Sequence, residues 1–141
     1  MALKVSKTDM WSVEIDDRAG GMADKIEPLA AAGANFEFVF ARRMPEQPGR
    51  GVAFVAPVKG TKAIRAATAA GFGKAADIHS LKVEGADKPG IGTKIMRCLA
   101  EAGISFRAIS ASAMNRKFVA YVALDSAADA ARAAVLLRKL G

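Results

Sequence analysis

The chain repeats one pattern at a constant offset of 70 residues, and this repeat constrains the fold more than any other feature. Val13-Glu14 recurs as Val83-Glu84, and the Leu-Ala-x-Ala-Gly sequence at residues 29–33 recurs at 99–103. Solenoid repeats are about 20–50 residues long, so this period is too long for a solenoid and long enough for a small domain. The sequence therefore predicts two copies of one small domain with matched sites.

Composition limits the possible partners and chemistry. Apolar residues make up 52% of the 141 residues, and the formal net charge of +7 favours acidic partners such as a carboxylate ligand, an anionic protein or nucleic acid. Cys98 is the only cysteine and His79 the only histidine, which excludes an internal disulfide, a histidine-based metal cluster and a catalytic triad. The start has no apolar leader and no run is long enough to span a membrane. We expect a cytoplasmic protein that is not an enzyme and uses no cofactor or metal.

Each copy shows the element order β-α-β-β-α. In the first copy we expect strands over residues 11–15, 36–40 and 52–55, and helices over 21–32 and 61–70. In the second copy we expect strands over 81–85, 106–110 and 118–124, and helices over 91–102 and 126–140. Pro28 lies inside the first of these helices and predicts a kink or a late start there.

A final strand in each copy would complete a ferredoxin-like βαββαβ pattern. Residues 74–79 can supply it in the first copy. The second copy has no residues left after its second helix, so residues 3–8 are expected to fill that place. The predicted organisation is an N-terminal strand segment over 1–9 that completes the second unit, a first unit over 10–79 and a second unit over 80–141.

A short motif recurs at the first helix of each copy. The second copy has Asp87-Lys88-Pro89-Gly90-Ile91 before this helix and Ala102-Gly103-Ile104-Ser105-Phe106 after it. The first copy has the weaker Asp17-Arg18-Ala19-Gly20 and Ala32-Gly33-Ala34-Asn35-Phe36, with Ala19 in place of the proline. Together with the element order, this pattern resembles the ACT domain family over nearly the whole chain.

The resemblance implies a fold and a function. The fold is α+β, with two ferredoxin-like βαββαβ units paired into a continuous antiparallel sheet that has helices on one face. The units pair as a homo-oligomer or as an intrachain pseudo-dimer. The function is a small-molecule-binding regulatory protein that binds an amino acid, or a similar small polar ligand, at the interface between units. Such a protein controls a separate metabolic enzyme or regulator.

The loop between the first strand and the first helix is the candidate ligand site. Its glycine lets a ligand approach the backbone, and the helix that follows presents unpaired N–H groups and a positive dipole end. The aspartate can accept a hydrogen bond from an ammonium group, although aspartates are also common turn and cap residues. The candidate ligand-binding residues are Asp87, Pro89, Gly90, Ile91, Gly92 and Ser105 in the second copy, and Asp17, Gly20, Gly21 and Asn35 in the first. In the first copy, Gly20-Gly21 is expected to loosen the turn.

Two alternative functions fit parts of the sequence. The stretch Arg50–Val55 partly matches the RNP1 pattern on the third strand of an RNA-recognition motif. Val52 and Pro57 replace two of the stacking aromatic residues that such motifs use. The first alternative is therefore an RNA-binding protein that uses this strand, and the second is a dimerisation module without a ligand.

Overall fold

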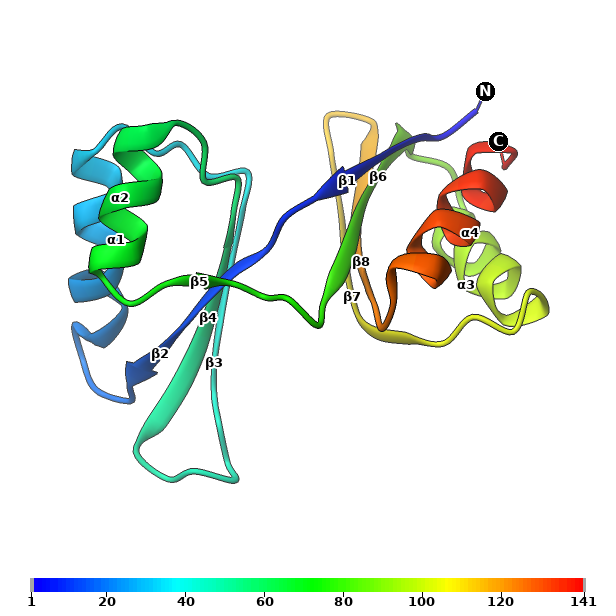
Figure 1. The fold of residues 1–141 in the computed structure, drawn as a ribbon. Coiled ribbons are helices and arrows are strands. Elements are labelled where there is room, and N and C mark those ends of the chain that lie inside the picture. Colours follow the sequence, from blue (N-terminus) through cyan, green and yellow to red (C-terminus); the bar gives the residue numbers. More distant parts are fainter. Residues whose placement is uncertain (1, 141) are drawn as a thin grey trace. The chain divides into compact units, whose positions relative to one another are not determined.

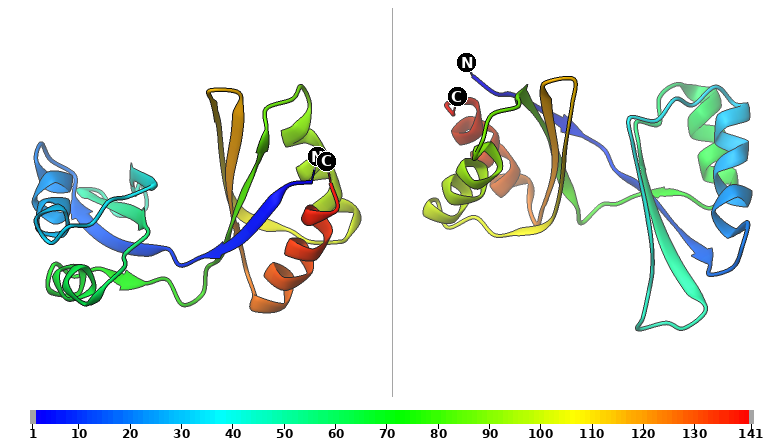
Figure 2. Two further views of the ribbon diagram at one scale, coloured as in Figure 1. Left: turned by 90° about the horizontal axis from the view of Figure 1, so that it is seen from above. Right: turned by 180° about the vertical axis from the view of Figure 1, so that it is seen from behind.

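A computed structural model describes residues 2–140, which form two compact units (Figure 1). One unit is Asp9–Ala75, and the other combines the N-terminal strand with the residues from Ala76 onward. Met1 and Gly141, the outermost residues of the expected segments 1–9 and 80–141, lie outside the described residues. In each unit the helices lie on one face of the sheet (Figure 2).

The Asp9–Ala75 unit has six elements in the expected order. They are β2 (Trp11–Asp16), α1 (Gly21–Ala31), β3 (Phe38–Arg43), β4 (Arg50–Ala56), α2 (Thr61–Ala69) and β5 (Gly73–Lys74). The sheet order is β3-β4-β2-β5, and every pair is antiparallel. Alternate residues of β2 and β4 face the helices, and with them they bury a core that includes Trp11, Leu29, Val55 and Phe72.

Two expectations for this unit are corrected. The last strand is the two-residue β5 rather than residues 74–79, because Ala75 donates its N–H to Met10 O at 3.0 Å and the chain then leaves the sheet. His79 instead begins the next strand, where it pairs with Leu124. Helix α1 begins at Gly21 and continues through Pro28, so the late start predicted from that proline does not occur.

The other unit repeats this topology. Its elements are β1 (Lys4–Thr8), β6 (His79–Ala86), α3 (Ile91–Glu101), β7 (Phe106–Met114), β8 (Lys117–Leu124) and α4 (Ala127–Arg138). The sheet order is β1-β6-β8-β7, so β1 occupies the place that β5 has in the other unit. The antiparallel β1–β6 register runs from Lys4 opposite Glu84 to Thr8 opposite Ser80. The first pair of this register, Lys4 and Glu84, joins residues that are 80 positions apart in the sequence.

The N-terminal segment is part of this second core. Leu3 and Val5 are buried with residues from α3, α4, β6 and β8. The backbone N–H of Leu3 donates to Leu140 O at 3.2 Å, and the Arg138 guanidinium donates to Val5 O at 2.9 Å. Side-chain burial and these hydrogen bonds together hold the segment against the last helix.

Both units have the predicted ferredoxin-like α+β fold. The strands form two four-stranded ladders, with β3 and β5 at the edges of one and β7 and β1 at the edges of the other. The expectation was one continuous sheet. Within residues 2–140 the backbone hydrogen bonds instead form two separate four-stranded sheets, each with its own edge strands. Pairing of units across such edges stays a prediction. None of the described helices is long and apolar enough to cross a membrane.

Candidate functional site

The loops before α1 and α3 are anchored in the same way. The Asp17 N–H donates to Gly49 O at 3.0 Å, and the Asp87 N–H donates to Arg116 O at 2.9 Å. In each unit the acceptor lies at the turn between the second and third strands of the βαββαβ pattern. One backbone hydrogen bond thus fixes the start of the loop against a neighbouring hairpin.

Each loop ends at a glycine that precedes the helix. Gly20 has φ +85° and Gly90 has φ +83°, a left-handed conformation that side chains with a Cβ rarely adopt. In α3 the Lys94 N–H donates to Gly90 O, whereas the N–H groups of Gly92 and Thr93 have no acceptor among the described residues. Two donors and the positive end of the helix dipole therefore remain open to an anionic group.

The remaining candidates of the second copy contribute in different ways. Asp87 and Pro89 are exposed, and the Asp87 carboxylate makes no ion pair or hydrogen bond within residues 2–140. Ile91 is 8% exposed and its side chain belongs to the core, so only its backbone can face a ligand. Ser105 is exposed just before β7, and no hydrogen bond in the described chain links it to the loop.

In the first copy, arginines already occupy the carboxylates around the loop. Arg43 Nε donates to Asp17 Oδ2 at 2.8 Å. Further ion pairs join Arg18 to Asp24 and Asp16, and Arg50 to Asp16 and Glu14. The offset repeat did not reveal these partners, because Ala113 and Ala86 stand in the second copy at the positions equivalent to Arg43 and Asp16. A ligand ammonium group would have to displace Arg43 to reach Asp17.

Gly21 has a packing role that the sequence analysis did not identify. A Cβ on this residue would lie 2.2 Å from Asp16 O, a distance that side chains do not tolerate. The glycine is therefore required by close packing of the helix start against the preceding strand, and its contact with a ligand stays a prediction. Asn35, the last candidate of this copy, is exposed in the segment before β3.

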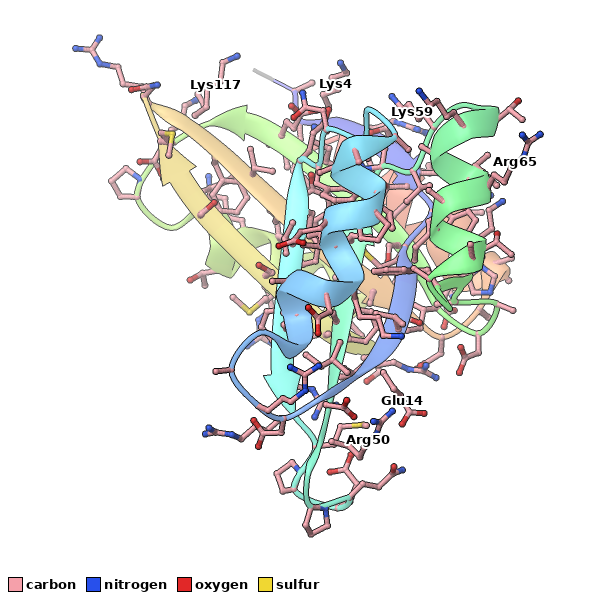
Figure 3. The ribbon with its side chains drawn as sticks, turned by 90° about the vertical axis from the view of Figure 1, so that its left-hand side faces the viewer. Lys4, Glu14, Arg50, Lys59, Arg65 and Lys117 are labelled. Carbon is pink, nitrogen blue, oxygen red and sulfur yellow. The ribbon has the colours of Figure 1, made fainter. Side chains whose placement is uncertain are left out.

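The RNP1-like stretch lies on β4, where strand alternation divides it between two faces. Gly51, Ala53 and Val55 are buried, whereas Val52 and Phe54 are only partly buried. Arg50 is paired with the carboxylates of Asp16 and Glu14, and Figure 3 shows Glu14 beside it. These acids would repel a phosphate, so the local charge does not favour RNA binding at this strand.

A groove between α3 and α4 is a further feature that the sequence analysis did not identify. It has a volume of about 620 Å³. Its lining combines apolar residues with charged ones: Thr93, Lys94, Arg97, Cys98, Glu101, Ala102, Leu136 and Leu140. Within residues 2–140, no group of three or more His, Cys, Asp and Glu side chains could hold a metal ion.

Comparison with known proteins identifies solved structures that have a similar fold. No protein-family model matches the chain, and no curated protein matches it in sequence. Protein BT0572 from Bacteroides thetaiotaomicron has a TM-score of 0.76 at 15% identity, over 96% of this chain and 99% of that one. The ligand-free regulatory subunit of aspartate kinase from Thermus thermophilus has a TM-score of 0.60 at 16% identity, over 97% of each chain.

A second regulatory subunit gives the same result. The aspartate kinase subunit from Thermus flavus has a TM-score of 0.58 at 17% identity, over 96% of this chain and 95% of that one. At these identities the likeness establishes the fold alone. The chain has the ACT-type fold that its motifs predict, as two ferredoxin-like units in tandem.

Proposed function

We propose that the protein is a regulatory module that binds an amino acid, or a similar small polar ligand, at the loop of residues 87–92. The observation that carries this proposal is that a carboxylate in the loop and two N–H groups at the start of α3 have no partner among the described residues. Within residues 2–140 the Asp87 carboxylate has no hydrogen-bond or ion-pair partner, and the Gly92 and Thr93 N–H groups have no acceptor. A zwitterion supplies an ammonium group for the first and a carboxylate for the second.

The fold supports a regulatory role. The chain and the aspartate kinase subunits match over nearly their whole lengths, and those proteins are described as regulatory subunits. A module of this kind has no need of catalytic groups of its own. We therefore propose that the ligand controls a separate metabolic enzyme or regulator rather than reacting on this protein.

The two loops are expected to bind with different strength. Asp17 forms an ion pair with Arg43, and further arginine–carboxylate ion pairs lie around its loop. Asp87 has no ion-pair partner in the described chain. Pro89 also restricts the second loop before binding, so that less conformational entropy is lost when a ligand orders it. The 87–92 loop is therefore the proposed principal site, and the 17–21 loop is a weaker one.

A thermal-shift screen against the twenty amino acids tests the proposal. A ligand present at 100 times its Kd stabilises the protein by about 2.7 kcal/mol, which gives a clear shift in Tm. Asp87→Asn removes the negative charge that pairs with the ammonium group and should abolish this shift. The matched variant Asp17→Asn should retain it, and both positions are exposed, so neither change should prevent folding.

The opposite outcomes are equally definite. If Asp17→Asn removes the shift and Asp87→Asn retains it, the principal site is the first loop. If no amino acid shifts the parent protein, the proposal fails. A shift with single-stranded RNA in that case would favour the β4 strand as an RNA-binding surface, and no shift at all would favour a dimerisation module without a ligand.

A further inference from the structure

The first helices of the two units carry opposite charges at equivalent positions. With the offset of 70 residues, Asp24 of α1 corresponds to Lys94 of α3, and Glu27 corresponds to Arg97. All four side chains are exposed. The chain has 14 acidic residues against 21 basic ones. An acidic pair on one helix at the positions of a basic pair on the other therefore departs from the basic character of the chain.

The basic pair borders an apolar groove. Lys94 and Arg97 lie on the rim of the α3–α4 groove, and neither has an ion-pair partner among the described residues. Glu101, one turn further along α3, also reaches this groove. The apolar part of its lining consists of Cys98, Ala102, Leu136 and Leu140. Unpaired cations around an apolar floor suit an element that offers carboxylates beside small apolar side chains.

The outer face of α1 has these properties. Asp24, Glu27, Pro28 and Ala31 are exposed and follow the spacing that places residues on one side of a helix. Glu27 has no ion-pair partner within residues 2–140, and Asp24 is bonded to Arg18 at 2.6 Å. Figure 3 views the unit from the side of its helices, with α1 and α2 in front of the sheet. The exposed Pro28 and Ala31 form a small apolar ridge between charged positions.

We propose that the α1 face of one chain docks into the α3–α4 groove of a second copy of this chain. Glu27 and Asp24 then lie against Arg97 and Lys94, and Pro28 lies on the apolar floor, as one helix ridge packs into the groove of another. Each chain has one donor face and one acceptor groove. The donor face and the acceptor groove are different surfaces, so the contact is heterologous and joins two chains as a closed pair or extends to further copies.

Each contact is small, because a single helix face covers less area than the roughly 1,200–2,000 Å² of a stable interface. When two chains exchange both contacts, the second contact forms within an existing complex and reinforces the first. We therefore expect weak self-association, which sedimentation velocity detects as a rise in average mass above the 14.7 kDa of the monomer between micromolar and millimolar concentrations.

Charge reversal tests the pairing directly. Arg97→Glu and Glu27→Arg should each abolish the rise in mass, because each variant alone brings like charges together at every contact between an α1 face and a groove. An equimolar mixture of the two variants should restore the rise in mass. Glu27 of the Arg97→Glu variant then meets Arg97 of the other variant, and the two substituted positions also carry opposite charges. Arg65→Glu on α2, an exposed position outside this face, changes the net charge as much as Arg97→Glu and should leave the association intact.

Other results overturn the proposal. A parent protein that remains at the monomer mass over the whole concentration range would show that the copies do not associate through this contact. Association that survives both Arg97→Glu and Glu27→Arg would show that another surface, such as the sheet edges, joins the copies. A mixture that stays monomeric would show that these two positions do not face each other. Circular dichroism of each variant separates loss of contact from loss of fold.

Discussion

Strand β1 should contribute a large share of the stability of its unit. Leu3 and Val5 are 6% and 5% exposed, and both belong to the core. A buried Leu→Ala change costs about 2–5 kcal/mol, and the two methyl groups lost from valine cost about 0.8 kcal/mol each. The double variant L3A/V5A should therefore lose about 5 kcal/mol. A domain of this size is stable by about 5–15 kcal/mol in total, so the loss is a large fraction.

Urea unfolding followed by far-ultraviolet circular dichroism measures this loss. With a slope of about 2 kcal/mol per molar urea, the transition of the affected unit should move down by about 2.5 M. The matched control is K4A/S6A, which changes the residues of the same strand that face away from the core. Trp11 is the only tryptophan and lies in the other unit, so its fluorescence follows that unit separately. If L3A/V5A and K4A/S6A unfold at the same urea concentration, β1 does not support the core as described.

Two further predictions concern a glycine and an exposed ion pair. Gly21→Ala should destabilise its unit by about 1–3 kcal/mol, because the new Cβ would lie 2.2 Å from Asp16 O. Gly92→Ala, where only the tip of one side chain comes as near as 3.9 Å, should be neutral or slightly stabilising, and equal urea midpoints for both variants would refute the packing argument. A hydrogen bond from Arg107 holds the pKa of Asp77 below its ordinary value, so the pair stabilises the folded state above the unfolded-state pKa and loses this effect as the pH falls through the folded-state pKa. Asp77→Asn should therefore reduce the fall of Tm between neutral and acid pH, and an unchanged fall would show that this exposed pair contributes nothing.

Local requirements explain which parts of the fold the sequence could predict. Leu29 and Leu99 are both completely buried, and Gly20 and Gly90 share a left-handed φ. Such residues are selected by the burial of one helix face or by the conformation of one loop position, so the repeat preserves them in both copies. The helices and most strands could be located for that reason.

Contacts between distant segments explain the rest. The role of Gly21 depends on the approach of Asp16 O, and Arg43 pairs with Asp17 across a distance of 26 residues, whereas the equivalent position in the other copy is Ala113. His79 follows the short β5 in sequence but pairs with Leu124, a partner that no local pattern reveals. In the candidate site, the motif located the loops, whereas the difference in their ion pairing became visible only in the structure. The identity of the ligand-binding residues stays a prediction.

The pairing of β1 with β6 has a consequence for synthesis on the ribosome. Domains generally fold as units and in order from the N-terminus as the chain emerges. Here strand β1 must wait until the whole Asp9–Ala75 unit and then β6 have been translated, because Lys4 pairs with Glu84. The inserted unit can close first, and the strand that precedes it stays without a partner during that interval. Slowing translation within the inserted unit would lengthen this exposure and give chaperones or a neighbouring nascent chain more time to capture the strand.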